Sequence, residues 1–171
     1  MTIMNSIEGL PFSEVGVSDQ RSVLLEAAYR EHAPRLRQLA HSILGSPAHI
    51  DDVVQDAFAK ALRSKTGIDH HGAYLRTAVV NGCRDRMRRE AVAARGLRRI
   101  GNESEVVLDD PDLGEMWGMV RRLRPKQRVV LALRYGEDLS EQQIADELQI
   151  PIGTVKTHIA RGLAALRKEM K

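Results

Sequence analysis

Cysteine, aromatic residues and long apolar runs are all scarce in this sequence of 171 residues. Cys83 is the single cysteine, which excludes an internal disulfide and a zinc site built from several thiolates. No uninterrupted apolar run approaches the ~20 residues that a bilayer-spanning helix needs. The stretch from Met1 to Val17 has no basic segment followed by an apolar core, so it does not have the pattern of a signal peptide. These absences lead us to expect a cytoplasmic protein.

The residues that are abundant favour helices. Aromatic residues make up 4% of the chain, whereas alanine, leucine and arginine are common, and this balance favours helix over sheet. The hydrophobic fraction of 43% supports packed cores, and the charged fraction of 29% is mixed in sign, which argues against wholesale disorder. No strand-like alternation persists along the chain. We therefore predict an all-α protein.

Composition divides the chain into four parts. Residues 1–18 mix glycine, proline and serine and are expected to form a flexible leader. Residues 19–100 and 113–171 carry the helical patterns and are expected to form two small domains. Residues 101–112 are acidic and contain helix breakers, so we expect them to form a flexible linker.

The first domain is expected to begin with a helical hairpin that ends at Gly45, a C′ residue. Ser46 and Pro47 then have the pattern of an N-cap and a first-turn proline. The helix that follows is expected to bury Ile50, Val53, Val54, Ala57, Phe58, Ala61 and Leu62. The same helix would present an acidic outer face, composed of Asp51, Asp52, Gln55 and Asp56.

A loop from Ser64 to Gly72 precedes a helix that runs from about Ala73 into a cluster of arginines. Such a concentration of positive charge suggests an anionic partner, although a solvated charged helix before an acidic linker is the alternative. The inner face of this helix fits Leu75, Ala78, Val79, Gly82 and Met87. The opposite stripe contains Thr77, Asn81, Arg84 and Arg88.

Residues 139–167 have the pattern of a helix-turn-helix. A capping box at Ser140 starts the first helix, and a tight turn, Gln149 to Pro151, leads into the second. The second helix of such a unit enters the major groove of DNA. Residues near its start that can donate hydrogen bonds are Thr154, Lys156, Thr157, His158 and Arg161. The alternative is a plain helical hairpin with a polar outer face.

Three segments resemble the sigma-70 family of bacterial transcription initiation factors. The run Leu123 to Arg167 resembles region 4 of that family, SPAHIDDVVQDAFAKAL (46–62) resembles region 2.2, and GAYLRTAVVNGCRDRMRR (72–89) resembles regions 2.3 and 2.4. The spacing and small size resemble the extracytoplasmic-function group, which keeps only domains two and four. The two halves in this order are far more specific than a helix-turn-helix alone.

The resemblance implies a sigma subunit that binds core RNA polymerase and directs it to promoters. In the family, domain two docks on the clamp helices of the β′ subunit, and the β flap is a further contact. Carried over to this sequence, the clamp contact would be made by Asp51, Asp52, Gln55 and Asp56. An acidic face suits a basic partner helix, while simple solubility is the alternative.

The resemblance also implies two promoter-binding surfaces. Asn81 matches a family position at the pocket for a flipped base, and its amide can both donate and accept hydrogen bonds. The implied minus-ten surface comprises Tyr74, Arg76, Asn81, Arg84, Arg86, Arg88 and Arg89. The implied minus-35 readers are Thr154, Lys156, Thr157, His158 and Arg161. Tyr74 stands where the family often has tryptophan, and His158 where it often has arginine.

One alternative is a stand-alone regulator that binds duplex DNA without polymerase. Such a regulator would carry a ligand or receiver domain in its N-terminal half, where this chain has the acidic and arginine-rich helices. We find no catalytic constellation, so we expect no enzyme, and we expect neither a cofactor nor a metal site among the six histidines. The resemblance implies an anti-sigma protein as a further partner, and no membrane contact is expected.

Overall fold

The computed structural model describes residues 15–64, 68, 70–98, 119–120 and 122–169, and this part of the chain is helical without any strand. The prediction of an all-α fold is confirmed. The predicted linker, 101–112, lies outside the described residues. The elements in order are α1 (Val15–Leu44), α2 (Ile50–Arg63), α3 (His71–Arg98), α5 (Pro125–Leu131), the π-helical turn η1 (Ala132–Gly136), α6 (Glu141–Leu148) and α7 (Ile152–Glu169).

The expected N-terminal hairpin is wrong, because α1 is one continuous helix of 30 residues. It contains Pro34, which lacks the backbone N–H of other residues. The helix nevertheless continues through the proline, because residues on both sides of it are packed in the core. Ala33 and Leu36, on either side of the proline, are both buried. Gly45 does follow the helix in the left-handed conformation, with φ of 73°, as predicted.

The start of α2 also differs from the prediction. The helix begins at Ile50, and Ser46 does not cap it, since its hydroxyl accepts from the backbone N–H of Ala48 at 3.2 Å. The N-cap is His49, whose φ of 71° is left-handed. Residues 47–49 therefore form a turn in place of the first helical turn. Leu62, expected to be buried, is 48% exposed near the end of the helix.

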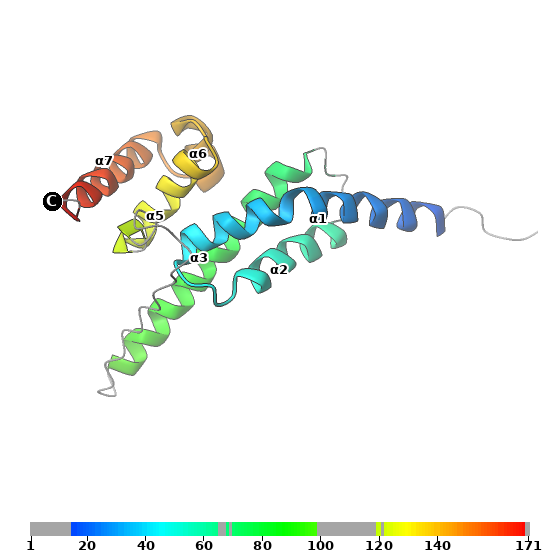
Figure 1. The fold of residues 1–171 in the computed structure, drawn as a ribbon, viewed down its shortest axis with the longest axis horizontal. Helices are drawn as coiled ribbons and strands as arrows, with labels where there is room; N and C mark the ends of the chain where they lie inside the picture. The colour runs from blue at the N-terminus through cyan, green and yellow to red at the C-terminus, as the bar shows by residue number, and fades with distance from the viewer. Residues whose placement is uncertain (1–14, 65–67, 69, 99–118, 121, 170–171) are drawn as a thin grey trace, which may run out of the picture.

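The first unit is a three-helix bundle of α1, α2 and α3, which lie side by side in Figure 1. Its core is built from small and branched aliphatic side chains together with the aromatic ring of Phe58. Leu75 and Val79 point into this core as predicted, together with Val80 and Cys83. From α2 the core receives Val53, Val54, Ala57, Phe58 and Ala61.

The second unit consists of α5, η1, α6 and α7, and its buried side chains belong to the same apolar cluster as those of the bundle. The predicted capping box is present, because the Ser140 hydroxyl accepts from the Gln143 N–H and the Gln143 side chain accepts from the Ser140 N–H. Gln149 ends α6 in the left-handed conformation, with φ of 55°. The buried inner faces comprise Ile144, Ala145, Leu148, Val155 and Ile159.

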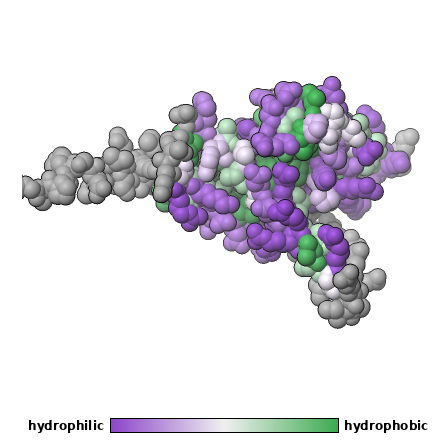
Figure 2. Space-filling view, turned by 180° about the vertical axis from the view of Figure 1, so that it is seen from behind, coloured by the Kyte–Doolittle hydropathy of each residue, from purple (hydrophilic) through white to green (hydrophobic). Residues whose placement is uncertain are grey.

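The two units are in contact, through α1 with α5 and with η1. Figure 1 shows α5 next to the end of α1, with α6 and α7 beyond it. The face of the molecule in Figure 2 is mainly hydrophilic, with apolar side chains scattered between the polar ones. Among the described residues, no helix combines the length and the apolar character that a membrane span requires.

Candidate nucleic-acid interface

The acidic outer face of α2 is exposed along its whole length, as expected from the sequence. Its first carboxylate, Asp51, accepts from Arg37 Nε of α1 at 2.7 Å. Arg37 also donates to the Tyr29 hydroxyl at 2.8 Å, and the hydrogen bonds to Asp51 and then Tyr29 raise the pKa of Arg37. Part of the negative charge of this face is therefore balanced within the bundle.

Asp52 has a partner as well. His49 Nδ1 lies 3.4 Å from Asp52 Oδ2, and the other ring nitrogen of His49 contacts the guanidinium of Arg86 on α3. His49 thus connects the start of α2 to the arginine-rich helix. Among the described residues, Gln55 and Asp56 make no ion pair or side-chain hydrogen bond and remain directed outward. These two have the side chains on this face that are most available to a partner.

The predicted polar stripe of α3 is exposed, except at Thr77, which is half-buried. Asn81, Arg84 and Arg88 are all exposed, and their spacing of three and four residues places them along one side of the helix. Arg88 Nη2 donates to Asp85 Oδ1 at 2.7 Å, so Asp85 orients a neighbouring arginine. Tyr74, at the start of the same helix, is 36% exposed. An amide flanked by cations can contact a base and the adjoining phosphates.

The remaining arginines of the predicted minus-ten surface differ in their surroundings. Arg89 is exposed, and Arg86 donates from Nε to Glu90 at 2.9 Å in addition to its contact with His49. Arg76 instead turns toward the second unit, where Glu147 of α6 accepts from its Nε at 3.0 and 3.2 Å and from its Nη2 at 2.9 Å. The sequence gives no signal for Glu147, because its partner lies 71 residues away.

The predicted recognition helix is α7. Lys156, Thr157 and Arg161 are exposed on it, and Thr154 and His158 are half-buried. Lys156 Nζ lies 3.9 Å from Glu141, and the Thr157 hydroxyl donates to the Gly153 carbonyl at 2.8 Å. Lys156 and Arg161 therefore present side-chain donors to solvent on the predicted recognition helix.

The pKa of His158 on this helix is perturbed. Desolvation by burial, followed by the charges of Lys126 and Arg161, lowers the pKa of His158 below 6.5. All these causes act against the imidazolium, so the ring is neutral at pH 7 in this form. A neutral imidazole has one donor and one acceptor nitrogen for a base edge.

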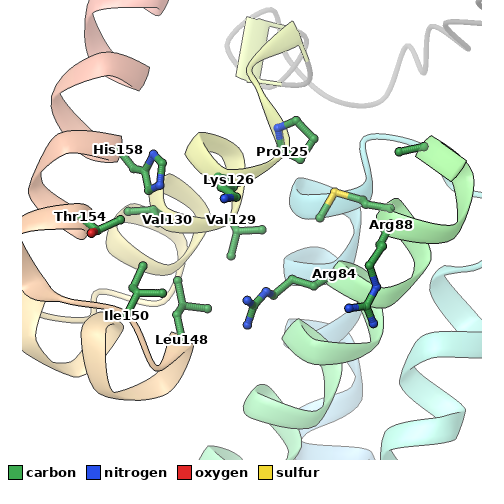
Figure 3. Close-up of a pocket in the computed structure, with 12 residues that line it drawn as sticks. Arg84, Arg88, Pro125, Lys126, Val129, Val130, Leu148, Ile150, Thr154 and His158 are labelled. Carbon is green, nitrogen blue, oxygen red and sulfur yellow. The ribbon is translucent and has the colours of Figure 1, made fainter. Parts of the chain in front are cut away.

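Predicted DNA-binding residues from both units line one pocket of about 400 Å³ (Figure 3). Arg84 and Arg88 come to it from α3, and Thr154 and His158 from α7. The floor between them is apolar, and the rim is basic. Lys126 of α5 adds a further cation, which no sequence motif indicates. The floor and its neighbours comprise Met87, Ala91, Pro125, Val129, Val130, Leu148 and Ile150.

Two family models match the chain. The model "Sigma-70 region 2" matches residues 28–92, and the model "Sigma-70, region 4" matches residues 113–166. The chain is 32% identical over 155 residues to the RNA polymerase sigma-E factor of Streptomyces coelicolor, with 85% of each chain covered. It is 28% identical over 156 residues to the ECF RNA polymerase sigma factor SigW of Bacillus subtilis, covering 80% of this chain and 83% of that one.

The fold is similar to those of two solved structures. One is the sigma factor RpoE of Bartonella quintana in complex with the anti-sigma factor NepR, at a TM-score of 0.60 and 23% identity, covering 90% of this chain and 96% of that chain. The other is CnrH in complex with the cytosolic domain of CnrY, at a TM-score of 0.62 and 23% identity, covering 91% and 92%. At this identity, the likeness concerns the arrangement of the helices.

Proposed function

The chain belongs to the extracytoplasmic-function group of the sigma-70 family and is a promoter-specific transcription initiation factor, and we propose that its two units divide the polymerase and promoter contacts between them. The observation that carries this proposal is the pairing of a region 2 bundle with a capped helix-turn-helix in one chain. Each unit presents exposed polar side chains at the positions that the resemblance assigns to partners.

The polymerase contact of region 2 uses the outer face of α2. Gln55 and Asp56 form its centre, because Asp51 and Asp52 already interact with Arg37 and His49. An exposed carboxylate and amide above a packed apolar face suit a basic helix such as the β′ clamp helices. Region 4 contacts the β flap, which leaves α7 to reach upstream DNA.

The minus-ten contact uses the exposed stripe of α3. Asn81 hydrogen-bonds the edge of an extruded base, and Tyr74 supplies a ring on which a base stacks. The arginines around them hold the backbone by charge, which positions the strand without reading its sequence. The residues assigned to this surface are Tyr74, Arg76, Asn81, Arg84, Arg86, Arg88 and Arg89.

The minus-35 contact uses the first turns of α7. Lys156, Thr157 and Arg161 reach base edges in the major groove, while Thr154 at the helix start contacts phosphate. His158 lies among these residues and is neutral, whereas an arginine at the same position would carry a positive charge. The minus-35 preference of this chain then depends on an imidazole at one recognition position.

The chain acts in the cytoplasm and has no catalytic activity of its own, since its effect is exerted through the polymerase. Relatives of this fold were solved with anti-sigma partners, namely NepR and the cytosolic domain of CnrY. We infer that an anti-sigma protein also controls this chain.

Reconstituted transcription tests the proposal. The purified chain, core RNA polymerase and fragmented genomic DNA are combined, and the 5′ ends of the transcripts are sequenced. We expect discrete start sites that share two upstream elements and that require both the chain and the core enzyme. Site-specific binding of the free chain to duplex DNA, without any start site in the presence of core, would indicate the stand-alone regulator instead.

A further inference from the structure

The pocket of about 400 Å³ beside α3 has the size and the lining of a small-molecule site (Figure 3). Its volume lies in the range of pockets that hold small organic ligands. Among the described residues that line it, more than half are apolar and none carries a carboxylate. The pocket therefore offers an apolar surface to a ligand without any negative charge to repel an anion.

The cations at the rim of this pocket are short of partners. Arg84 and Lys126 are both exposed, and neither makes an ion pair or a side-chain hydrogen bond with any described residue. Arg88, beside them, is already paired with Asp85 at 2.7 Å. Figure 3 shows the Arg84 side chain extending from α3 across the space toward Leu148 at the end of α6. An anion that enters the pocket thus meets the unpaired charges of Arg84 and Lys126.

The polar groups that α7 contributes are uncharged. Thr154 and His158 are half-buried, and the lowered pKa of His158 keeps its imidazole neutral at pH 7. A hydroxyl group and a neutral imidazole can each donate one hydrogen bond to an oxygen atom of a ligand. The described lining residues include no Phe, Tyr or Trp on which a nucleobase would stack. This lining suits an aliphatic body with one anionic, oxygen-bearing end.

We propose that the pocket binds a small amphiphilic anion, namely a carboxylate with an alkyl chain of medium length. The carboxylate accepts hydrogen bonds from the Arg84 guanidinium and lies between Arg84 and Lys126, because charge-assisted pairing of this kind is short and strong. The alkyl chain covers the apolar side chains between α3 and α5, which removes both surfaces from water. Such a ligand goes beyond the proposed function, which assigns only macromolecular partners to the chain.

Isothermal titration calorimetry of the full-length chain with sodium octanoate tests the site. We expect one saturable site. Acetate has the same carboxylate without the long chain, and 1-octanol has the chain without the charge, so each should bind at least about 10-fold more weakly. Equal binding of acetate would indicate a general anion site, and equal binding of 1-octanol a purely apolar one. Either result, or no saturable binding of octanoate, would overturn the proposal.

Arg84→Gln tests the contact with the carboxylate. It should weaken octanoate binding at least about 10-fold, because it removes a charge-assisted hydrogen bond. Arg63→Gln makes the same change in net charge at an exposed arginine at the end of α2, which does not line the pocket, and should leave the affinity at the parent value. Equal affinities in these two variants would overturn Arg84 as the residue that binds the anionic end.

Ala91→Glu tests the position of the ligand. Ala91 is exposed and lines the pocket, so a carboxylate there repels the anion and should reduce octanoate binding below detection. Ala93→Glu is the matched control, because Ala93 is an exposed alanine on the same helix outside the pocket lining. Circular dichroism checks that both variants are as helical as the parent. Equal binding by the two variants would place the ligand elsewhere and overturn the proposal.

Thermal unfolding separates a specific site from surfactant action. A ligand that binds the folded form raises Tm, so octanoate should raise the Tm of the parent and of Ala93→Glu but not that of Ala91→Glu. A fall in Tm with several weak sites would indicate adventitious surfactant binding only and would overturn the proposal. These measurements need neither polymerase nor promoter, so failure of the ligand site and failure of the proposed function can be distinguished.

Discussion

Gly82 of α3 lies so close to Val53 of α2 that a β carbon at position 82 would be 2.9 Å from Val53 Cγ1. Valine is branched at its β carbon and cannot turn this methyl group away at low cost. The two helices therefore approach at a point where only a hydrogen atom fits. This approach positions the acidic face of α2 relative to the stripe of α3 that is proposed to contact DNA, whose exposed part begins at Asn81.

Gly82→Ala should destabilise region 2 although alanine favours helix. The clash costs about 1–3 kcal/mol, which exceeds the ~1 kcal/mol of helix propensity gained. Urea unfolding monitored by circular dichroism measures the difference. The matched control is Gly96→Ala on the same helix, where a β carbon meets nothing within 4 Å and the substitution should stabilise the helix. Restoration of stability by Val53→Ala in the Gly82→Ala background would identify the contact, and equal stability of the two glycine variants would contradict it.

Asp56→Lys should weaken binding to core polymerase about 10-fold, because it places a cation where a basic partner helix is proposed to dock. Fluorescence anisotropy of labelled chain titrated with core measures the affinity at fixed salt. Glu31→Lys is the control, since Glu31 is an exposed carboxylate on α1 outside the α2 face. Asp51→Lys should be less informative, because it also removes the partner of Arg37. Equal affinities for Asp56→Lys and Glu31→Lys would rule out the α2 face as the docking site.

Asn81→Ala should leave core binding unchanged and reduce open-complex formation. The loss of one good polar contact to a base is worth about 1–3 kcal/mol, and Asn81 is exposed, so its removal creates no cavity. Permanganate reactivity of promoter thymines in the holoenzyme complex reports the opening. If the thymines react equally in the variant and the parent, Asn81 does not contact the extruded base.

The sequence predicted those features whose cause is local. The capping box needs Ser140 and Gln143 three residues apart, and the buried face of α7 follows from helical periodicity at Val155 and Ile159. The sequence predicts the start of α2 at Ser46 and Pro47, whereas the helix begins at Ile50. The difference arises because His49 adopts a left-handed conformation, which the Ser-Pro pair before it does not predict. The contact of Arg76 with Glu147 could not be predicted, since it depends on how α3 and α6, which are distant in the sequence, pack together.

Acidification should destabilise region 4 through His158. Burial, followed by the charges of Lys126 and Arg161 in the same unit, lowers the pKa of His158. A lowered pKa means that the neutral ring stabilises the folded unit, and this contribution is lost as pH falls below 6.5 toward the lowered value. Urea unfolding monitored by circular dichroism should therefore show the parent losing stability as pH falls below 6.5. His158→Gln should remove that loss, and a loss of the same size in the variant would assign it to another group.

Arg161 and Lys168 should separate base reading from backbone binding on α7. Both are exposed, but Arg161 lies within the first turns of the helix and Lys168 lies near its end, where a recognition helix usually leaves the groove. In the holoenzyme, Arg161→Ala should therefore cost about 1–3 kcal/mol on the preferred minus-35 sequence and little on a scrambled one. Lys168→Ala should weaken binding to both sequences alike and reduce the salt dependence by about one unit, as expected for a single phosphate contact. Filter binding at several salt concentrations measures both quantities. A uniform loss across sequences for Arg161→Ala would place Arg161 on the backbone and pass the reading role to Lys156 or His158.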